Sequence, residues 1–279
     1  MIAFLQRLCG YALTGETCEQ VLAFVYGPGG NGKSVFINTI AGIMNSYAKI
    51  AAMETFTASR YERHPVELAM LQGARLVVAS ETEEGRIWAA SRIKQLTGCD
   101  PITARFMRQN FFTFTPQFKL ILVGNHAPQL GRVDDAIRRR FLIVPFMQRP
   151  KAPDQNLEEK LRSEWPDILR WMIDGCLRWQ AKGLQPPAAV TAATQEYFEQ
   201  EDIIGQWLDE YCKVETGSFV SVRKAFEAWR EFAESRGQDP GNERDFSAEM
   251  KRRGFEKKNR TIQGKPTKAW VGVALRGRQ

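Results

Sequence analysis

The chain has 279 residues, of which 43% are hydrophobic and 25% charged, a balance ordinary for a soluble globular protein of one large or two modest domains. Five cysteines without C-x-x-C spacing exclude a disulfide framework or a zinc site, and no run approaches the roughly 20 apolar residues of a membrane helix, so we expect a cytoplasmic protein without a membrane partner. The formal net charge of +7 favours a polyanionic partner such as nucleic acid.

The first 150 residues alternate apolar runs with segments of helical spacing. The expected elements are a short amphipathic helix with a turn (1–20), a buried strand (21–26), a helix (34–44), three further buried strands (75–80, 118–123 and 141–146) and, before the third strand, an alternating Phe-, Thr- and Arg-rich β-hairpin (103–114). Because strands alternate with helices, the predicted fold class is α/β, a three-layer αβα domain with a mainly parallel sheet.

The remainder of the chain is mainly helical and becomes strongly basic towards its end. The expected elements are a Trp-rich helical segment (157–180), a linker (183–187), three helices (194–211, 222–236 and 244–253) and two strands joined by a Gly-Lys turn (260–275). Three helices followed by a hairpin is the order of a winged helix. The predicted domains are an N-terminal helical segment (1–20), an α/β core (21–150), a helical connector (151–190) and a C-terminal winged-helix domain (191–279).

Residues 27–34 read Gly-Pro-Gly-Gly-Asn-Gly-Lys-Ser and fit the phosphate-binding pattern G-x-x-x-x-G-K-[ST] in full, between an expected strand and an expected helix. The glycines let backbone N–H groups face phosphate oxygens, and the helix adds the positive end of its dipole. In this Walker A loop, Lys33 is expected to reach the β- and γ-phosphates and the Ser34 hydroxyl to bind Mg²⁺. The predicted nucleotide-binding residues are Gly27, Pro28, Gly29, Gly30, Asn31, Gly32, Lys33, Ser34 and Val35, with ATP and Mg²⁺ as cofactors.

The loop alone does not choose among nucleotide-using proteins. The Asn-Lys-x-Asp motif of GTPases and the Leu-Ser-Gly-Gly motif of ABC ATPases are both absent from the sequence. A small-molecule kinase stays open from the loop, although it would leave the expected hairpin and the basic C-terminal segment without a role.

An acidic motif ends the second apolar strand, which we expect beside the strand of the phosphate-binding loop. Residues 80–84 read Ser-Glu-Thr-Glu-Glu, and an acid at the end of such a strand orients Mg²⁺ or the attacking water, as in a Walker B motif. Glu81 is the predicted catalytic carboxylate and, with Ser34, the predicted metal-binding residue. Glu83 and Glu84 are further candidates. A solvated acidic turn is the alternative interpretation.

Two more polar positions flank the last strands of the expected core. Asn125 follows the strand at 118–123, where ligands of parallel α/β sheets bind, and is expected to hydrogen-bond the attacking water or the γ-phosphate. Asparagine is also a common turn residue. Residues 138–140 are three arginines, of which Arg139 or Arg140 is predicted to stabilise charge on the transferring phosphoryl group. The alternative is a basic surface cluster.

In this order, and together with residues 93–100 and 112–116, these motifs resemble the helicase module of superfamily 3. The likeness spans about residues 22–146 and is to the satellite-phage type of phage and plasmid primases, kin to the poxvirus nucleoside triphosphatase. It implies an AAA+-like P-loop NTPase that assembles as a ring, with a hexamer expected, and moves along single-stranded DNA. It also implies that Lys94 and Arg105 belong to the motif between Walker B and the sensor, where they are predicted to bind DNA, and that Arg108 carries the charge at the tip of a DNA-contacting hairpin.

The C-terminal segment resembles the winged helix of the same group less specifically. Arg244, Lys251 and Arg252 lie on or near the expected recognition helix and Lys265 on the wing, where they are predicted to contact the phosphates of single- or double-stranded DNA. A solvated basic face is the alternative. Such proteins usually carry a primase domain and a helical collar upstream. The chain is therefore expected to be a fragment, a compact relative or one subunit of a split system, encoded by a phage, prophage or plasmid in a bacterial host.

Two functions remain open. The first is an ATP-dependent DNA helicase motor for replication of a mobile element, working as a homo-oligomeric ring. The second is an ATP-dependent switch that assembles on an origin or on other DNA without unwinding it. A degenerate module that does not hydrolyse ATP is disfavoured because Lys33, Glu81 and Asn125 are all present.

Overall fold

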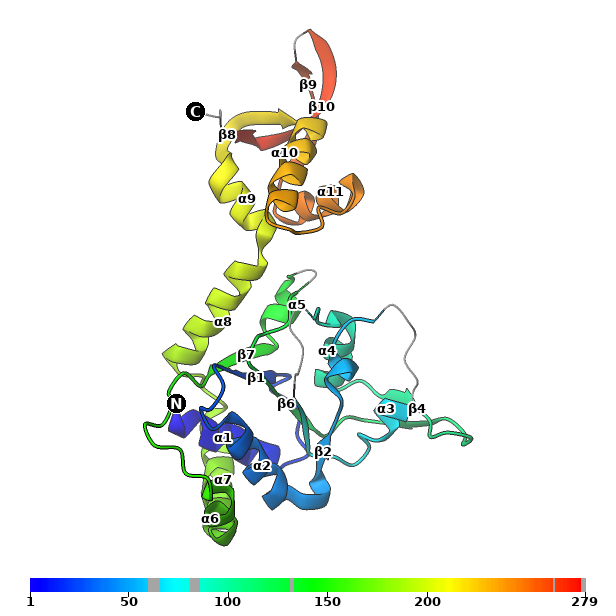
Figure 1. Cartoon of the computed structure of the whole chain (residues 1–279). Helices are drawn as coiled ribbons and strands as arrows, with labels where there is room; N and C mark the ends of the chain where they lie inside the picture. The colour runs from blue at the N-terminus through cyan, green and yellow to red at the C-terminus, as the bar shows by residue number, and fades with distance from the viewer. Residues whose placement is uncertain (60–65, 81–85, 131–132, 263, 277–279) are drawn as a thin grey trace. The chain divides into compact units, whose positions relative to one another are not determined.

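The chain forms two compact units, Met1–Glu201 and Asp202–Gln279 (Figure 1). The computed structural model describes residues 1–59, 66–80, 86–130, 133–262 and 264–276. The residue contacts divide the chain once, between 201 and 202, whereas the sequence analysis places boundaries at 20, 150 and 190. The expected connector, 151–190, belongs to the first compact unit.

A five-stranded parallel sheet forms the centre of the first unit, in the order β2-β3-β6-β1-β7. The strands are β1 (Leu22–Tyr26), β2 (Ala48–Ile50), β3 (Leu76–Ser80), β6 (Lys119–Gly124) and β7 (Phe141–Pro145). The four predicted strands are confirmed. They could be predicted because strands that are buried on both faces are unbroken apolar runs. The short β2 was not predicted, since three residues of which none is buried give no such run.

The neighbour of β3 differs from the expectation. The acidic motif was expected on a strand beside the strand of the phosphate-binding loop, but β6 lies between β3 and β1. An apolar run indicates that a strand is buried, but it carries no information on which strands flank it. The crossover connection between two parallel strands can place another strand between them.

Helices cover both faces of this sheet and make three layers. Along β1, Leu22 and Phe24 enter one core while Ala23 and Val25 enter the other, because successive side chains point to opposite faces. The Ala23 face is covered by α1 (Ile2–Ala12), α2 (Lys33–Met44) and α7 (Trp165–Lys182). The Leu22 face is covered by α4 (Ala90–Thr97), α5 (Asp135–Arg138) and α8 (Ala188–Glu201).

Short elements and breaks complete the first unit. The short elements are the helices α3 (Val66–Ala69) and α6 (Leu157–Ser163) and the 3₁₀ turns η1 (Asn45–Tyr47) and η2 (Met53–Phe56). The helical segment expected at 157–180 is two helices, α6 and α7, divided at Glu164. At the edge of the sheet, the backbone N–H of Ile143 in β7 donates to Thr194 Oγ1 of α8 at 3.0 Å, so the helix supplies an acceptor that no further strand provides.

The predicted β-hairpin is confirmed. Strands β4 (Ile102–Ala104) and β5 (Phe112–Phe114) pair antiparallel, with Ile102 opposite Phe114. Figure 1 shows the loop between them extending away from the central sheet. Phe106 stacks on Phe112 with ring centroids 5.7 Å apart, and both pack against the core, which holds the base of the hairpin.

The second unit combines three helices with a three-stranded antiparallel sheet in the order β8-β10-β9. Its elements in chain order are α9 (Ile203–Tyr211), β8 (Cys212–Ser221), α10 (Val222–Ser235), α11 (Glu243–Arg252), β9 (Glu256–Ile262) and β10 (Lys265–Leu275). The single helix expected at 194–211 is interrupted at Asp202, whose carboxylate accepts from Gly205 N at 3.0 Å and caps α9. Strand β8 was not predicted, because it is mostly exposed and lacks apolar alternation.

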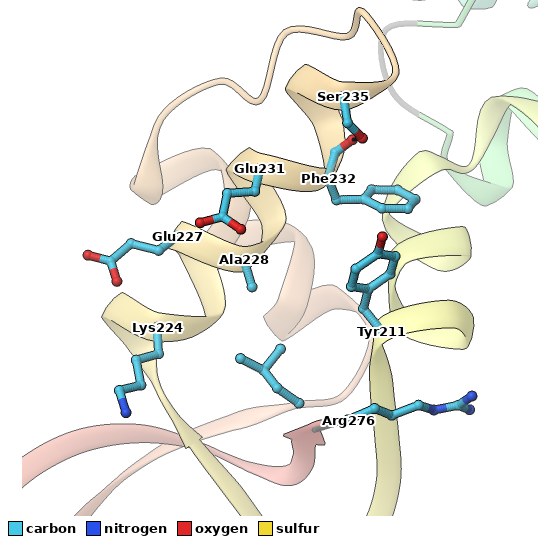
Figure 2. A pocket seen from close by; sticks show the side chains of 9 residues that line it. Tyr211, Lys224, Glu227, Ala228, Glu231, Phe232, Ser235 and Arg276 are labelled. Atoms are coloured by element: carbon cyan, nitrogen blue, oxygen red, sulfur yellow. Dashed lines mark hydrogen bonds between the residues drawn. The ribbon is translucent and has the colours of Figure 1, made fainter. Parts of the chain in front are cut away.

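Aromatic side chains build the core of the second unit. The buried rings of Trp207, Trp229 and Phe246 contact one another, with Trp229 stacked on Phe246 at 6.2 Å. A cavity of about 440 Å³ opens between α10 and the end of β10. Figure 2 shows Tyr211 and Phe232 facing each other on one side of it. None of its lining residues comes from α11, so it is separate from the basic helix.

Buried Lys119 leads to a prediction on pH dependence. Its ammonium group lies among the carbonyl oxygens of Thr14, Glu16 and Gln117, and burial, with the nearby Arg75, lowers its pKa to about 7. An unfolded lysine has a pKa of about 10.4, so between these values the unfolded chain binds a proton that the folded chain does not. Stability should therefore rise with pH from about 7 to 10, by at most about 1.4 kcal/mol per pH unit.

Urea unfolding of the wild type and Lys119→Met at pH 7, 8 and 9 checks this prediction. The wild-type free energy of unfolding should rise faster with pH than that of the variant. Equal slopes in the two proteins would contradict it.

Among the described residues, no helix is both long and apolar enough to cross a membrane.

Candidate functional site

The glycine-rich loop links the end of β1 to the start of α2. Gly27 has a φ of +146°, and a Cβ there would collide with the backbone carbonyl of Phe146. Gly32, at φ +83°, is the N-cap of α2, which begins at Lys33. Both positions therefore require glycine, one for the close approach of the backbone and the other for its left-handed conformation. The loop predicted from the sequence is thus formed at the N-terminus of a twelve-residue helix.

The ammonium group of Lys33 lies at the centre of the site and is almost fully buried. Its Nζ lies 2.6 Å from Gly27 O and 3.1 Å from each of Pro28 O, Asn31 Oδ1 and Asn125 Oδ1, four acceptors that share its three N–H groups. Burial lowers the pKa of Lys33, and the charge of Arg149 lowers it further. Lys33 and Asn125, predicted separately from motifs 92 residues apart, are therefore in direct contact.

Asn31 has a bracing role that the motif does not reveal. Its side chain accepts from Lys33 Nζ and donates to the carbonyl of Phe146, at the end of β7. Phe146 N in turn donates to Tyr26 O at 2.8 Å. The loop is thereby attached to two strands. Sequence reasoning also missed Arg149, which lies four residues after the end of β7, the strand that flanks β1. This position was the available signal.

Parallel pairing brings the remaining strand ends to the same edge. Tyr26 is in register with Gly124 of β6 and Pro145 of β7, and Ser80 with Val123. Ser34 is exposed in the first turn of α2, and Asn125 is exposed directly after β6. Ser80, the first residue of the acidic motif, ends β3 at this same edge, whereas Glu81, Glu83 and Glu84 lie outside the described residues.

The two candidate arginines differ in their surroundings. Arg140 is 8% exposed, and its guanidinium donates to Thr97 Oγ1 at 3.1 Å and to Ala136 O at 2.7 Å. Burial lowers the pKa of Arg140, and the adjacent Arg139 lowers it further. Arg139 itself is exposed. The guanidinium of Arg140 thus has intramolecular acceptors in the core, whereas that of Arg139 faces solvent.

Helix α4 contacts both ends of the segment that carries these arginines. Lys94 of α4 forms an ion pair with Asp134 at 2.5 Å, and Asp134 caps α5 by accepting from Ile137 N. One turn later, Thr97 accepts from Arg140 on the other side of α5. Lys94, which the sequence analysis predicts to bind DNA, therefore contacts the segment that carries the arginines. The chain separation of 40 residues between Lys94 and Asp134 explains why no local pattern showed this pair.

Replacing Thr97 tests the contact at the second end. Thr97→Val keeps the volume of the side chain but leaves a buried donor of Arg140 without its acceptor, so we expect a loss of about 1–3 kcal/mol in the free energy of unfolding. Thr97→Ser keeps the hydroxyl and should lose less. Urea denaturation of the three proteins measures the difference. Equal losses in the two variants would mean that the hydroxyl contributes nothing.

The hairpin residues predicted to bind DNA lie at and near its tip. The guanidinium carbon of Arg105 lies 4.7 Å from the ring centroid of Phe111. Arg108 is exposed and has a φ of +58°, a left-handed conformation that is uncommon for arginine. The two charges therefore remain at the projecting end of the hairpin.

In the second unit, Arg244, Lys251 and Arg252 of α11 and Lys265 at the start of β10 are exposed. Arg252 forms an ion pair with Glu249 of its own helix at 2.6 Å. The other three lie at the two ends of α11 and at the start of β10.

Comparison with known proteins adds relatives to this geometry. A family described as "Family of unknown function (DUF5906)" matches residues 25–140. A protein of Acanthamoeba polyphaga mimivirus named "Putative helicase" is 26% identical over 258 residues, covering 84% of this chain and 27% of the viral protein. A protein of the same name from Invertebrate iridescent virus 6 is 31% identical over 236 residues, covering 70% of this chain and 24% of the relative. The chain resembles helicase-like proteins of large DNA viruses.

The chain spans about a quarter of the length of these curated relatives. They come from large viruses of eukaryotes, so the expected bacterial host and phage or plasmid origin find no support. Among solved structures, the apo C-terminal region of NrS-1 has a TM-score of 0.58 at 11% identity, covering 96% of this chain and 70% of that one. This similarity concerns the fold alone.

Proposed function

We propose that this chain is the ATP-hydrolysing motor of a DNA helicase of superfamily 3, moving along single-stranded DNA as a ring, with six subunits expected. The observation that carries the proposal is the hydrogen bond from Lys33 of the Walker A loop to Asn125 at the end of β6. This contact places the expected phosphate-binding cation, Lys33, directly beside the polar residue that follows the neighbouring strand, Asn125. The helicase-named viral relatives agree with this assignment.

The site fits a nucleoside triphosphate with Mg²⁺. A Cβ on Gly29, Gly30 or Gly32 would meet nothing within 4 Å, so the outer side of the loop is open for phosphate oxygens to approach its N–H groups. Lys33 supplies a cation for the β- and γ-phosphates, and the exposed Ser34 hydroxyl a ligand for the metal. Mg²⁺, when bound, neutralises charge that develops on the phosphates.

Water activation falls to polar groups at the same edge of the sheet. Asn125 accepts from Lys33 through Oδ1, which leaves its amide N–H groups to orient a water or a γ-phosphate oxygen. We assign Glu81 as the carboxylate that receives the proton of the attacking water, on the basis of its place directly after β3.

We assign the arginine of the transition state to Arg139, acting on the nucleotide of a neighbouring subunit. Its exposure supports this choice, because a buried guanidinium that is already hydrogen-bonded cannot reach another chain. Arg140 becomes a positioning residue that holds the segment against α4 through Thr97.

The second unit supports a nucleic-acid-binding role. We assign this unit as a winged helix, with α11 as recognition helix and the β9–β10 turn as wing, because its elements follow the order α9-β8-α10-α11-β9-β10. Arg244, Lys251 and Lys265 would contact DNA phosphates, with Arg252 available if its ion pair with Glu249 opens. Such contacts predict binding that weakens with salt.

The test is the ATPase rate of the wild type with and without single-stranded DNA, followed by strand displacement on a forked duplex. The motor predicts hydrolysis that DNA stimulates, together with displacement that needs ATP. Hydrolysis indifferent to DNA would reject the helicase assignment. ATP-dependent DNA binding without displacement would favour the alternative, a switch that assembles on DNA.

A further inference from the structure

The tip of the β4–β5 hairpin exposes apolar side chains that the fold does not use. Phe111 is 61% exposed and Met107 69% exposed, whereas the neighbouring rings of Phe106, Phe112 and Phe114 pack against the core. Both side chains keep most of their surface outside the core. They are therefore available to a ligand.

Positive charge accompanies this exposed ring. The Arg105 guanidinium lies 4.7 Å from the ring centroid of Phe111, a cation–π contact that restrains the ring and covers one of its sides. Arg108, between Met107 and Phe111 in the chain, has a left-handed φ of +58°. Arginine rarely adopts this conformation, so the packing of the surrounding loop must hold the tip in this shape.

An aromatic ring beside two arginines complements one class of ligand best. Every nucleobase has a flat π face that stacks on an aromatic side chain, and every nucleotide carries a phosphate that pairs with arginine. Double-stranded DNA keeps its bases stacked on one another. A single strand therefore fits this tip better than a duplex.

We propose that Phe111, restrained by Arg105, stacks on an unpaired base of single-stranded nucleic acid while Arg108 pairs with an adjacent phosphate. The inference deepens the proposed helicase function and rests on it for the nature of the strand. It assigns the hairpin a contact with the bases themselves, in addition to contacts with the backbone. Because stacking tolerates any base, the contact suits movement along a strand of any sequence.

The test compares two single strands of equal length and charge, one of thymidines and one with abasic sites in place of the bases. Binding to the full chain is measured by fluorescence anisotropy without nucleotide. Wild type should bind the thymidine strand about tenfold more tightly. Phe111→Ala and Phe111→Leu should lose this preference while binding the abasic strand as the wild type does, and Phe111→Trp should keep it. Arg108→Ala should weaken the binding of both strands by the same factor.

Three outcomes would overturn the inference. They are a preference for the thymidine strand that survives in Phe111→Ala, an equal loss on both strands in that variant, and a change in self-association without any change in base preference. The last would assign Phe111 to a protein contact. The test also separates this inference from the proposed function. If Phe111 sets a preference for bases but DNA does not stimulate hydrolysis, stacking is supported and the helicase assignment is rejected. If DNA stimulates hydrolysis but the preference for bases does not depend on Phe111, only stacking is rejected.

Discussion

Lys33→Met should lower kcat for ATP hydrolysis by about 100-fold or more. The variant loses the cation placed for the β- and γ-phosphates, and removing one such donor from a transition state typically costs a factor of about 100 to 1,000. Methionine keeps an unbranched apolar stem in a pocket where lysine is only 5% exposed. The loss should therefore arise from the missing charge rather than from a collapsed loop.

The measurement is steady-state hydrolysis over a range of ATP concentrations at saturating single-stranded DNA. Lys151→Met, which removes an exposed lysine after β7, is the matched control and should retain the wild-type rate. Thermal unfolding shows whether each protein is folded. A folded Lys33→Met protein with the wild-type rate would mean that the loop does not serve hydrolysis.

The central sheet was predictable because its chemistry is local. Strands β1, β3, β6 and β7 are buried on both sides, so each is a continuous apolar run bounded by turn residues. Strand order was not predictable, since pairing between β3 and β6 depends on the path of the connections. Strand β8 was not predicted because its residues are mainly exposed and polar. Such a strand is stabilised by pairing with its neighbour, here β10, and its own sequence shows no apolar alternation.

The candidate site shows the same division. The loop at 27–34 is a continuous motif, and its glycines have local backbone reasons. The support of this loop is not local, because the Phe146 carbonyl accepts from Asn31 across 115 residues. The same holds for the arginine segment, where Lys94 pairs with Asp134 across 40 residues. Three consecutive arginines look equivalent in the sequence. Only the packing of α4 against α5 shows that Arg140 is buried on Thr97 and that Arg139 is exposed.

Arg139→Ala should lower kcat by about 1,000-fold or more without changing the stability of the fold, because an arginine finger contributes about a factor of 1,000 to 100,000. Arg140→Ala removes a buried guanidinium that donates to Thr97 Oγ1 and Ala136 O, so it should lower both activity and the free energy of unfolding. Arg138→Ala, which loses a guanidinium 5.1 Å from the Phe198 ring centroid, is the neighbouring control and should stay within a few-fold of the wild-type rate.

Mixing two inactive proteins shows whether Arg139 acts across a subunit boundary. An Arg139→Ala subunit keeps Lys33, and a Lys33→Met subunit keeps Arg139. In a ring, some interfaces of the mixture pair an intact Lys33 with an intact Arg139 from the next subunit, so hydrolysis should recover to a fraction of the wild-type rate that depends on the mixing ratio. Recovery requires that the two residues serve one site from different chains. If both variants assemble together and the mixture stays inactive, Arg139 does not complete a neighbour's site.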